Sequence, residues 1–370
     1  MTQKKKVLVV GSGVGGSTLA YTLQRAGIDA HCIDIKSSTP ATGSGINLMH
    51  NTLRALGGIG LAEQCLDSGF PFNAFKQHAA AGQLLMTNPA PPCCGIRRPE
   101  LARILETAAE STGAMLEKDL TVADLTDRGD RVEVTLSDGR QETYDLVVAA
   151  DGAYSKLRDR VFGLEHRVWF AGQSGWRFNA PRPSDVDAFC LWRSSDGKRT
   201  VGAFPTSRDT CYFFFLESSA EHIHLANDQL HTLLYERLEA FSAPALRESL
   251  AHVTSASQVI FRPFDVNLVP APWHRGRVVL LGDAAHSPTP QMTSGGGMAI
   301  EDAVVLAECL SQTDKVPEAL AHYSKRRFER VKTVWEASLQ LCRYEQEPVP
   351  NPQRSAALLL ESYQYLGQPM

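Results

Sequence analysis

A glycine-rich turn near the start of the chain constrains the fold more than any other feature of the sequence. The turn, residues 11–16, reads GSGVGG; it follows the apolar segment 5–10 and precedes a helix predicted over residues 17–26. A second strand is predicted over residues 30–34. A strand, glycine turn, helix and strand within about 30 residues form the unit in which this glycine spacing binds a dinucleotide.

Each glycine of the turn has a separate predicted task. Gly11 permits the tight turn, Gly13 lets a pyrophosphate approach the backbone, and Gly16 lets the helix and strand pack closely. The phosphates then meet the positive end of the helix dipole and its unpaired N–H groups. Asp34 ends the second strand, where a carboxylate accepts hydrogen bonds from ribose hydroxyls. The alternative interpretation is a glycine-rich turn that binds nothing.

Two further motifs lie at the ends of predicted buried strands. Asp151 and Gly152 follow a strand near the middle of the chain, and Gly282 and Asp283 follow another strand over residues 277–281. The glycine turn by itself serves either NAD or FAD, so the last motif has to discriminate between them. A carboxylate at that strand end can hold a ribityl hydroxyl, which favours FAD.

The segment after Asp283 supports the same ligand. Pro290 lies in a loop that leads to a helix predicted to start near Met298. Backbone N–H groups there can face the flavin pyrimidine, where negative charge accumulates on reduction. The alternative is that the glycine run before this helix is only a flexible linker. That run consists of Gly295, Gly296 and Gly297.

With these three motifs in this order, the chain resembles the single-component flavoprotein aromatic hydroxylases. This p-hydroxybenzoate hydroxylase-like class includes salicylate, 6-hydroxynicotinate and FAD-dependent urate hydroxylases. The resemblance covers about residues 5–340, and residues 145–158 match a family stretch associated with both FAD and NAD(P)H. Since no His or Cys stands in an attachment motif, FAD is expected to be noncovalent. Family positions that contact FAD fall on Gly13, Asp34, Arg98, Val122 and Asp283.

The resemblance implies an FAD-dependent monooxygenase. It would use NAD(P)H and O2, through a flavin hydroperoxide, to hydroxylate a small electron-rich aromatic or heteroaromatic compound. Because the cofactor carries the chemistry, few side chains need be catalytic. Alternatives are an enzyme for a larger polyketide or alkaloid scaffold, a nonoxygenating FAD reductase, and a flavin-dependent halogenase, whose signature residues 175–181 echo loosely.

The chain departs from the family pattern in two places. Thr293 and Gly297 stand where the family loop has its first Gly and its Asn, which puts the usual contacts of that Asn side chain in doubt. Asn47 stands where 6-hydroxynicotinate hydroxylases have a histidine thought to act as a base. That substrate is therefore disfavoured unless His50 acts as the base instead, with Asn47 facing the substrate.

Arg199 and Tyr212 match an arginine and a tyrosine that contact substrate in the urate hydroxylases. A guanidinium can pair with an anionic ring substituent, and a tyrosine can bond a hydroxyl while it stacks, so Tyr212 is a candidate for catalysis as well as binding. Arg177 is a further candidate partner for an anion. The alternatives are that Arg199 is a surface residue of a strand and that Tyr212 belongs to the core.

The order of the predicted strands and helices along the sequence indicates an α/β fold with an insertion. Residues 1–168 and 270–345 are expected to form a discontinuous Rossmann-type FAD-binding domain, because they alternate buried strands with helical patterns. Residues 169–269 are strand-rich and aromatic, which predicts an inserted, mostly antiparallel sheet domain for the substrate. Residues 346–370 are expected to be a C-terminal helical tail.

Composition excludes several other classes of protein. The eight cysteines are scattered without a C-x-x-C pair, which predicts reduced thiols and no metal site. A formal charge of -4 with mixed signs disfavours nucleic acid as a partner. No apolar run reaches membrane-spanning length, and the start of the chain leads into a strand rather than a leader. We therefore expect a cytoplasmic monomer or homodimer.

Overall fold

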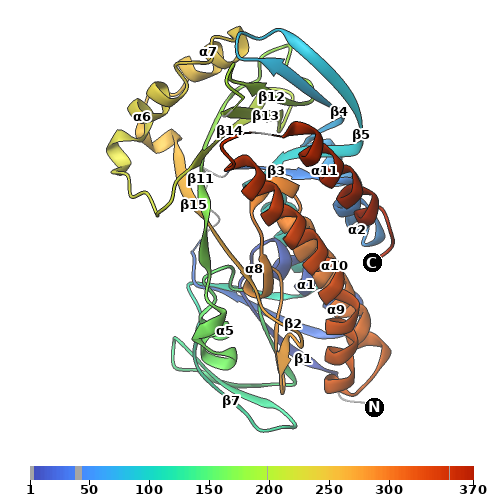
Figure 1. The fold of residues 1–370 in the computed structure, drawn as a ribbon. Helices are drawn as coiled ribbons and strands as arrows, with labels where there is room; N and C mark the ends of the chain where they lie inside the picture. Colours follow the sequence, from blue (N-terminus) through green and yellow to red (C-terminus); the bar gives the residue numbers. More distant parts are fainter. Residues whose placement is uncertain (1–3, 38–43, 198, 350) are drawn as a thin grey trace.

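The computed structural model describes residues 4–37, 44–197, 199–349 and 351–370, and it has two large sheets joined along one side by a long helix (Figure 1). The first sheet has the strand order β16-β17-β10-β1-β2-β6. Strands β1, β2, β6, β10 and β17 run parallel, as buried strands joined by helical crossovers do. Its strands are β1 Lys6–Val10, β2 Asp29–Asp34, β6 Met115–Lys118, β10 Leu146–Ala149, β16 His274–Arg275 and β17 Val278–Leu280.

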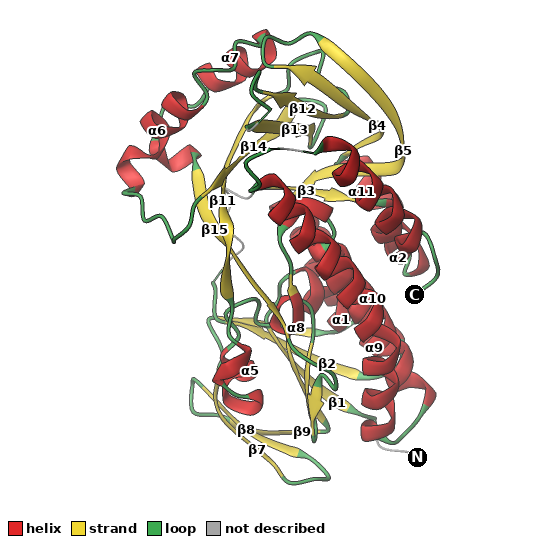
Figure 2. Cartoon of the chain, viewed as in Figure 1, coloured by secondary structure: helices red, strands yellow, loops and turns green. Residues whose placement is uncertain are grey.

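Helices pack beside this sheet and bury its apolar strands. The core between them contains the β1, β10 and β17 strands, which are apolar on both faces because helices and the neighbouring small sheet cover them. A three-stranded sheet, β7-β8-β9, lies at the same end of the molecule (Figure 2). These elements are α1 Val14–Arg25, α4 Arg98–Ser111, α5 Lys156–Phe162, α8 Asp283–His286, α9 Gly295–Gln312, β7 Val122–Asp127, β8 Val132–Leu136 and β9 Gln141–Tyr144.

The second sheet has eight strands in the order β15-β11-β14-β13-β12-β4-β5-β3. All its pairs are antiparallel except β12 with β4. It takes β3, β4 and β5 from a part of the sequence that precedes the predicted insertion, so the predicted domain boundaries stay a prediction. The strands are β3 Gly45–Leu48, β4 Phe70–Ala79, β5 Leu84–Arg97, β11 Trp169–Pro181, β12 Phe189–Arg193, β13 Thr200–Pro205, β14 Thr210–Ser218 and β15 Ile260–Leu268.

The eight-stranded sheet has two different faces. One packs Trp176, Phe213 and other apolar side chains against the helices α6 Leu230–Arg237 and α7 Pro244–Ala251, which lie at its outer edge (Figure 2). The opposite face carries alternate residues of the same strands, including Tyr212 and Phe214. This second face packs against α10 Val316–Glu345 and α11 Pro352–Leu366. The helices α2 His50–Gly58 and α3 Ala62–Ser68 pack instead on the alternate side chains of β3 and β5, such as Ile46 and Ile96.

The long helix α10 connects the two halves of the molecule. It begins beside the parallel sheet and ends against the eight-stranded sheet, where α11 turns back along it (Figure 1). The predicted fold class is confirmed, with an α/β sheet, a mostly antiparallel second sheet and C-terminal helices. None of the helices in the described ranges is long and apolar enough to cross a bilayer.

One predicted helix has other bounds than expected. The helix predicted to start near Met298 begins at Gly295, because the glycine run forms its first turn. In the insertion, α6 ends at Arg237, and the chain between it and α7 is not helical.

Candidate active site

The glycine turn shows two kinds of glycine. A Cβ atom on Gly11, whose φ is 108°, would lie 2.3 Å from the carbonyl oxygen of Ala150, and one on Gly16 would lie 1.8 Å from that of Gly11. These two glycines therefore let the backbone segments pack. A Cβ on Gly13 would meet nothing within 4 Å, although Gly13 immediately precedes α1. Gly13 thus leaves open space at a helix N-terminus, where a phosphate can approach the backbone.

Asp34 holds this turn from the end of β2. Its Oδ2 accepts from the backbone N–H of Ser12 at 2.8 Å and from the Ser12 hydroxyl at 3.0 Å. Lys118 donates to the same hydroxyl at 2.7 Å and to Glu106 at 2.6 Å. The sequence analysis missed Lys118 and Glu106, because isolated charged residues carry no motif. Together these side chains fix the carboxylate beside the glycine turn.

The middle motif begins a helix and bridges to the third motif. The Asp151 Oδ2 accepts from the N–H of Lys156 at 3.0 Å, whereas its Oδ1 is buried and has no hydrogen-bond partner in the described structure. Burial raises the pKa of Asp151 above its ordinary value. Arg158, buried nearby, donates to the carbonyl oxygens of Ala153 at 2.8 Å and Ala284 at 3.2 Å. Two motifs distant in sequence are thereby joined.

The third motif rests on buried charges. Asp302 accepts from the N–H of Gly282 at 3.1 Å and lies 2.6 Å from the ring of His286. The φ of Gly282 is 60°, a backbone conformation that favours glycine. His286 is therefore part of the support for the turn, and it presents the next side chain, Asp283, at the start of α8. Asp283 is accessible to water, yet desolvation raises its pKa.

Behind Asp302 lies a network of fully buried ion pairs. Arg327 bonds Asp302 at 2.7 Å and Glu301 at 2.8 Å, and Arg330 bonds Glu301 at 2.8 Å. Asn51 donates to the other Glu301 oxygen at 3.0 Å. Burial opposes ionisation, but Arg327 and Arg330 hold the pKa of Glu301 below its ordinary value, and His286 with Arg327 does the same for Asp302. Each charge is paired, which is the condition for such groups to be buried at all.

The glycine run is a packed helix start and not a linker. A Cβ on Gly297 would lie 2.1 Å from the Thr52 hydroxyl, and one on Gly296 would lie 2.7 Å from Ile46. Gly295 is similarly confined by Pro288. Because α9 starts here, its first N–H groups lie directly after the loop that contains the short 3-10 helix Pro290–Met292.

Met298 is predicted to contact the cofactor, but its backbone N–H and its side chain are both engaged within the protein. Its backbone N–H donates to the Ser294 oxygen at 2.8 Å, and its side chain is buried in the core beside Arg327. Neither group is available to a ligand. Thr293, in the same loop, has a φ of 48°, which costs a non-glycine residue about 1–2 kcal/mol. Its hydroxyl is buried beside the Tyr363 side chain.

Four predicted site residues come together where the two sheets face each other. The charges of Arg177 and Arg98 both act on Tyr212, whose pKa is nevertheless raised by burial. Desolvation, and then the charge of Arg177, lowers the pKa of Arg98, while Tyr212 and Asp283 oppose that change. Two guanidinium groups, a buried phenol and a carboxylate are thus neighbours.

Strand β3 brings the loop before α2 against this group. A Cβ on Gly45 would lie 2.7 Å from the Tyr212 ring, so only glycine lets the two strands approach this closely. Asn47 is buried on the same strand, donates to the Met49 sulfur at 3.1 Å, and leaves its Oδ1 without a partner in the described residues. Asn47 lies two residues along β3 from Gly45 and has an acceptor without a partner in the described residues, and its contact with substrate stays a prediction.

Three phenylalanine rings lie near Tyr212 on the same face of the sheet. Phe204 lies 5.1 Å and Phe214 6.1 Å from it, ring centre to ring centre, and Phe189 packs on both. From the C-terminal helix α11, Tyr363 packs against the same cluster, and burial raises its pKa to about 12. The sequence analysis missed Tyr363, because one tyrosine in an amphipathic tail helix is not a motif.

Two predicted residues lie elsewhere. The backbone N–H of Arg199 donates to the Ser194 hydroxyl at 3.0 Å, and its guanidinium donates to the Arg237 carbonyl at 3.5 Å, beyond the end of β13 that is remote from Tyr212. His50, at the start of α2, lies against the backbone of Tyr363, and burial with the charge of Arg54 lowers its pKa. The structure therefore does not bring Arg199 or His50 to the group around Tyr212, and their functional roles stay predictions.

The remaining predicted cofactor residues are near the glycine turn. Val122 begins β7, and the N–H of Leu120 donates to the Asp34 carbonyl at 2.9 Å, so Val122 lies close to the end of β2. A Cβ on Gly152 would meet nothing within 4 Å. Gly13 and Gly152 thus leave open space beside the backbone, and the buried Oδ1 of Asp151 has no hydrogen-bond partner among the described residues. The residues present fit a dinucleotide that carries a flavin.

Comparison with known proteins gives a consistent result. A family model described as "FAD binding domain" matches residues 4–338. The chain is 31% identical over 348 residues to YetM of Bacillus subtilis (strain 168), covering 92% of this chain and 93% of that protein. It is 28% identical to an FAD-dependent urate hydroxylase of Klebsiella pneumoniae, covering 88% and 87% of the two chains. The solved structure of Klebsiella pneumoniae HpxO with FAD and uric acid matches with a TM-score of 0.83 at 24% identity, covering 98% and 92%.

Proposed function

The chain belongs to the FAD binding domain family, and from that premise we propose that it hydroxylates a small, electron-rich heteroaromatic ring. It is an FAD-dependent monooxygenase that uses NAD(P)H as its electron donor. When bound, FAD supplies the activation of O2. The tasks of the chain are to bind the cofactor, orient the substrate and exclude water.

The residues around the three motifs would hold FAD. The open backbone at Gly13 and the N-terminus of α1 would take the pyrophosphate, with Asp34 on the ribose. Asp283 would accept from the ribityl chain, and Arg98 would lie beside it. The start of α9 would offer backbone N–H groups to the flavin ring.

One observation carries the proposed substrate class: Tyr212 lies buried on an aromatic sheet face, near enough to Arg98 and Arg177 for both charges to act on its hydroxyl. The phenyl rings of Phe204 and Phe214 suit a flat ring, and the guanidinium groups suit an anionic or carbonyl substituent. Tyr212 would hydrogen-bond a hydroxyl or carbonyl of the ring. The urate hydroxylase among the relatives supports this class over a larger polyketide or alkaloid.

The finer features belong to the same proposal. We propose a cytoplasmic monomer or homodimer, supported by eight cysteines that are all free and buried, as expected in a reducing compartment. We propose O2 and a small aromatic compound as the molecules that meet in this site. Among candidate bases, the geometry favours Tyr212 over His50, which faces α11.

The test is a panel of phenols, aromatic acids, pyridines, quinolines and purines. Each compound is scored for stimulated NAD(P)H oxidation and for a hydroxylated product formed in matching amount. A small heteroaromatic ring with an anionic or carbonyl substituent should score best. Strong stimulation only by large polycyclic scaffolds would favour the alternative, and a dependence on halide would indicate a halogenase.

A further inference from the structure

We propose that a line of apolar side chains on the eight-stranded sheet binds a straight hydrocarbon substituent of the substrate. The enzyme would then favour a ring that carries an apolar tail over the same ring without one. This line, here called the apolar row, consists of Phe214, Phe189, Leu191, Phe75 and Met86. The inference rests on the proposed function and adds the shape of its substrate.

The strand register connects the apolar row to the proposed substrate site. Arg177 of β11 lies opposite Phe214 of β14. Phe214 lies opposite Gly202 of β13, and Gly202 lies opposite Leu191 of β12. Residues directly opposite each other in a sheet point to the same face. Phe214 and Leu191 therefore lie on the face that carries Arg177.

The same line continues to the edge of the sheet. Leu191 lies opposite Gln77 of β4, and Gln77 lies opposite Met86 of β5. Phe75, two residues before Gln77, points to the same face. Met86 is 51% exposed. The row thus leads from the neighbourhood of Arg177 to the surface of the protein.

The aromatic side chains of the row form a continuous apolar surface. A Cβ on Gly202 would lie 1.9 Å from the Phe214 ring, so this ring lies over β13 where no side chain interrupts it. The ring centres of Phe214 and Phe189 are 5.8 Å apart, and those of Phe189 and Phe75 are 5.5 Å apart. Leu191 packs against the same cluster. A tail can therefore stay in apolar contact from β14 to β4.

The row keeps surface that a ligand can cover. Although α10 and α11 pack on this face, Phe214 and Leu191 are only half-buried. Their neighbours in sequence, Phe215 and Trp192, point to the other face and are 3% and 2% exposed beneath α6 and α7. Only the face with the row leaves apolar surface accessible, and covering such surface with a hydrocarbon favours binding.

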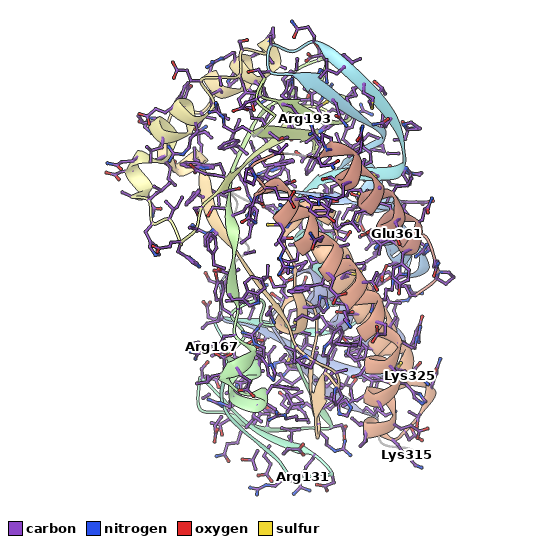
Figure 3. The ribbon with its side chains drawn as sticks, in the orientation of Figure 1. Arg131, Arg167, Arg193, Lys315, Lys325 and Glu361 are labelled. Carbon is purple, nitrogen blue, oxygen red and sulfur yellow. The ribbon has the colours of Figure 1, made fainter. Side chains whose placement is uncertain are left out.

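A polar border on one side of the row sets the direction of the tail. Arg193, labelled in Figure 3 on the upper sheet, lies two residues after Leu191 on β12 and points to the same face. Thr200 lies opposite Arg193 on β13. A hydrocarbon over these two residues would desolvate polar groups without bonding them. The tail is thereby kept on the side of Phe189 and Phe75.

The spacing of the strands predicts how binding depends on tail length. Adjacent strands are about 4.8 Å apart, so a tail that starts over Phe214 must extend about 10 Å to reach Leu191 and about 14 Å to reach Phe75. A short substituent contacts Phe214 alone. A change at Leu191 should therefore affect long tails and leave short ones unaffected.

The experiment measures dissociation constants from the perturbation of the flavin absorbance in the holoenzyme. The probes are pyridine-3-carboxylic acids with a methyl, butyl or octyl chain on the far side of the ring, so that the carboxylate is constant and only the tail varies. The wild-type protein should bind the octyl probe at least about 100-fold more tightly than the methyl probe, since burying one CH2 group improves binding by up to about four-fold.

The variant that tests the row is Leu191→Trp, whose larger side chain would occupy the place that the tail needs beyond Phe214. It should leave the dissociation constants of the methyl and butyl probes within about two-fold and weaken the octyl probe at least about ten-fold. If this variant does not fold, Leu191→Gln, which is similar in size but polar, should weaken the octyl probe at least about three-fold.

The matched control is Leu85→Trp, the same substitution on β5. Leu85 is 64% exposed and, as the neighbour of Met86 in sequence, points to the opposite face. It should keep the wild-type dependence on tail length. Equal binding of the three probes to the wild-type protein overturns the proposal, and so does an unchanged octyl affinity in a folded Leu191 variant.

A second copy of the chain is the other occupant that could cover this face. The protein would then be a dimer in size-exclusion chromatography, Met86→Asp would convert it to a monomer, and the probes would bind without regard to tail length. That combination of results would overturn the proposal.

The row and the proposed function fail in different ways. If rings of the panel stimulate NAD(P)H oxidation but tail length has no effect, the row alone is rejected. If no ring stimulates NAD(P)H oxidation, the proposed function is rejected, and the row with it.

Discussion

The buried ion-pair network beneath the third motif, here called the floor, differs from the sheet face that carries Tyr212 in how its buried polar groups are paired. Below the motif, Asp302, Arg327 and Glu301 pair completely with one another. On the sheet side, Arg193 and Gln291 each keep a buried polar atom without a partner in the described residues. Paired buried charges hold a scaffold in place, whereas a buried polar atom without a protein partner on the sheet face is available to a ligand or to water.

The difference follows from what each region has to do. The floor must hold the Gly282 turn in one conformation, so every charge needs a partner before the ligand arrives. The sheet face has to bind a ligand, so some of its own hydrogen-bonding groups cannot be paired within the protein. This contrast predicts that changes in the floor affect stability, while changes on the face affect ligands and leave the fold intact.

The largest expected effect is on binding of the cofactor. Gly13→Val should abolish FAD loading, because the side chain would fill the open space where the backbone meets the pyrophosphate, while φ at -66° tolerates valine. The purified variant should be folded and colourless, by circular dichroism and flavin absorbance. Gly58→Val, also in open space but on α2, should stay yellow. A yellow Gly13→Val protein would make the turn structural only.

In the floor, Arg327→Ala should lower the free energy of unfolding by about 3–5 kcal/mol, because it leaves Glu301 and Asp302 buried and unpaired. Urea unfolding measures the change. The neighbouring Arg326 pairs with Glu308 at the surface, so Arg326→Ala should change stability by less than about 1 kcal/mol. Equal effects of the two substitutions would contradict the importance of the buried network.

On the face, Arg177→Ala should raise the apparent KM for an anionic substrate by a factor that corresponds to about 2–5 kcal/mol. Its guanidinium lies beside buried Tyr212, so the substrate anion would lose its partner in a desolvated place. Steady-state kinetics with a verified substrate provide the measurement, and FAD content provides the control. Loss of FAD in this variant would show that Arg177 holds the cofactor and not the substrate.

Between the two regions, Asp283→Ala should weaken FAD by about 1.5–3 kcal/mol, or about 10- to 100-fold in Kd, through loss of a charge-assisted hydrogen bond. The exposed Asp314 is a suitable control, since Asp314→Ala removes a carboxylate from the surface. Fluorescence titration of the apoprotein with FAD distinguishes the variants. Wild-type affinity in Asp283→Ala would show that this carboxylate does not hold the cofactor.

The smallest expected effect concerns Arg199. Since its guanidinium donates to the Arg237 carbonyl, remote from Tyr212, Arg199→Ala should change KM by less than about two-fold. The family resemblance by itself predicts the larger effect. A KM change as large as that of Arg177→Ala would restore Arg199 to the substrate site and imply that the sheet moves on binding.

The sequence by itself determined the cofactor end. Gly11, Gly13 and Gly16 lie in one turn, and Asp34 follows at the end of the next strand, so local periodicity and spacing were enough to predict a dinucleotide site. The same holds for Asp283 at the end of a buried strand. The class of enzyme then followed from the order of the motifs, and the family match confirms it.

Only the tertiary structure decided which side chains share the substrate face. The direction of Arg177 depends on the register of β11 with β14, and a strand of alternating residues can present either of its two sets to the ligand. Tyr363 reaches the substrate face because α11 turns back along α10 (Figure 1). A tyrosine in a tail helix belongs to no sequence motif, and only the packing of segments distant in sequence places it against the aromatic side chains around Tyr212.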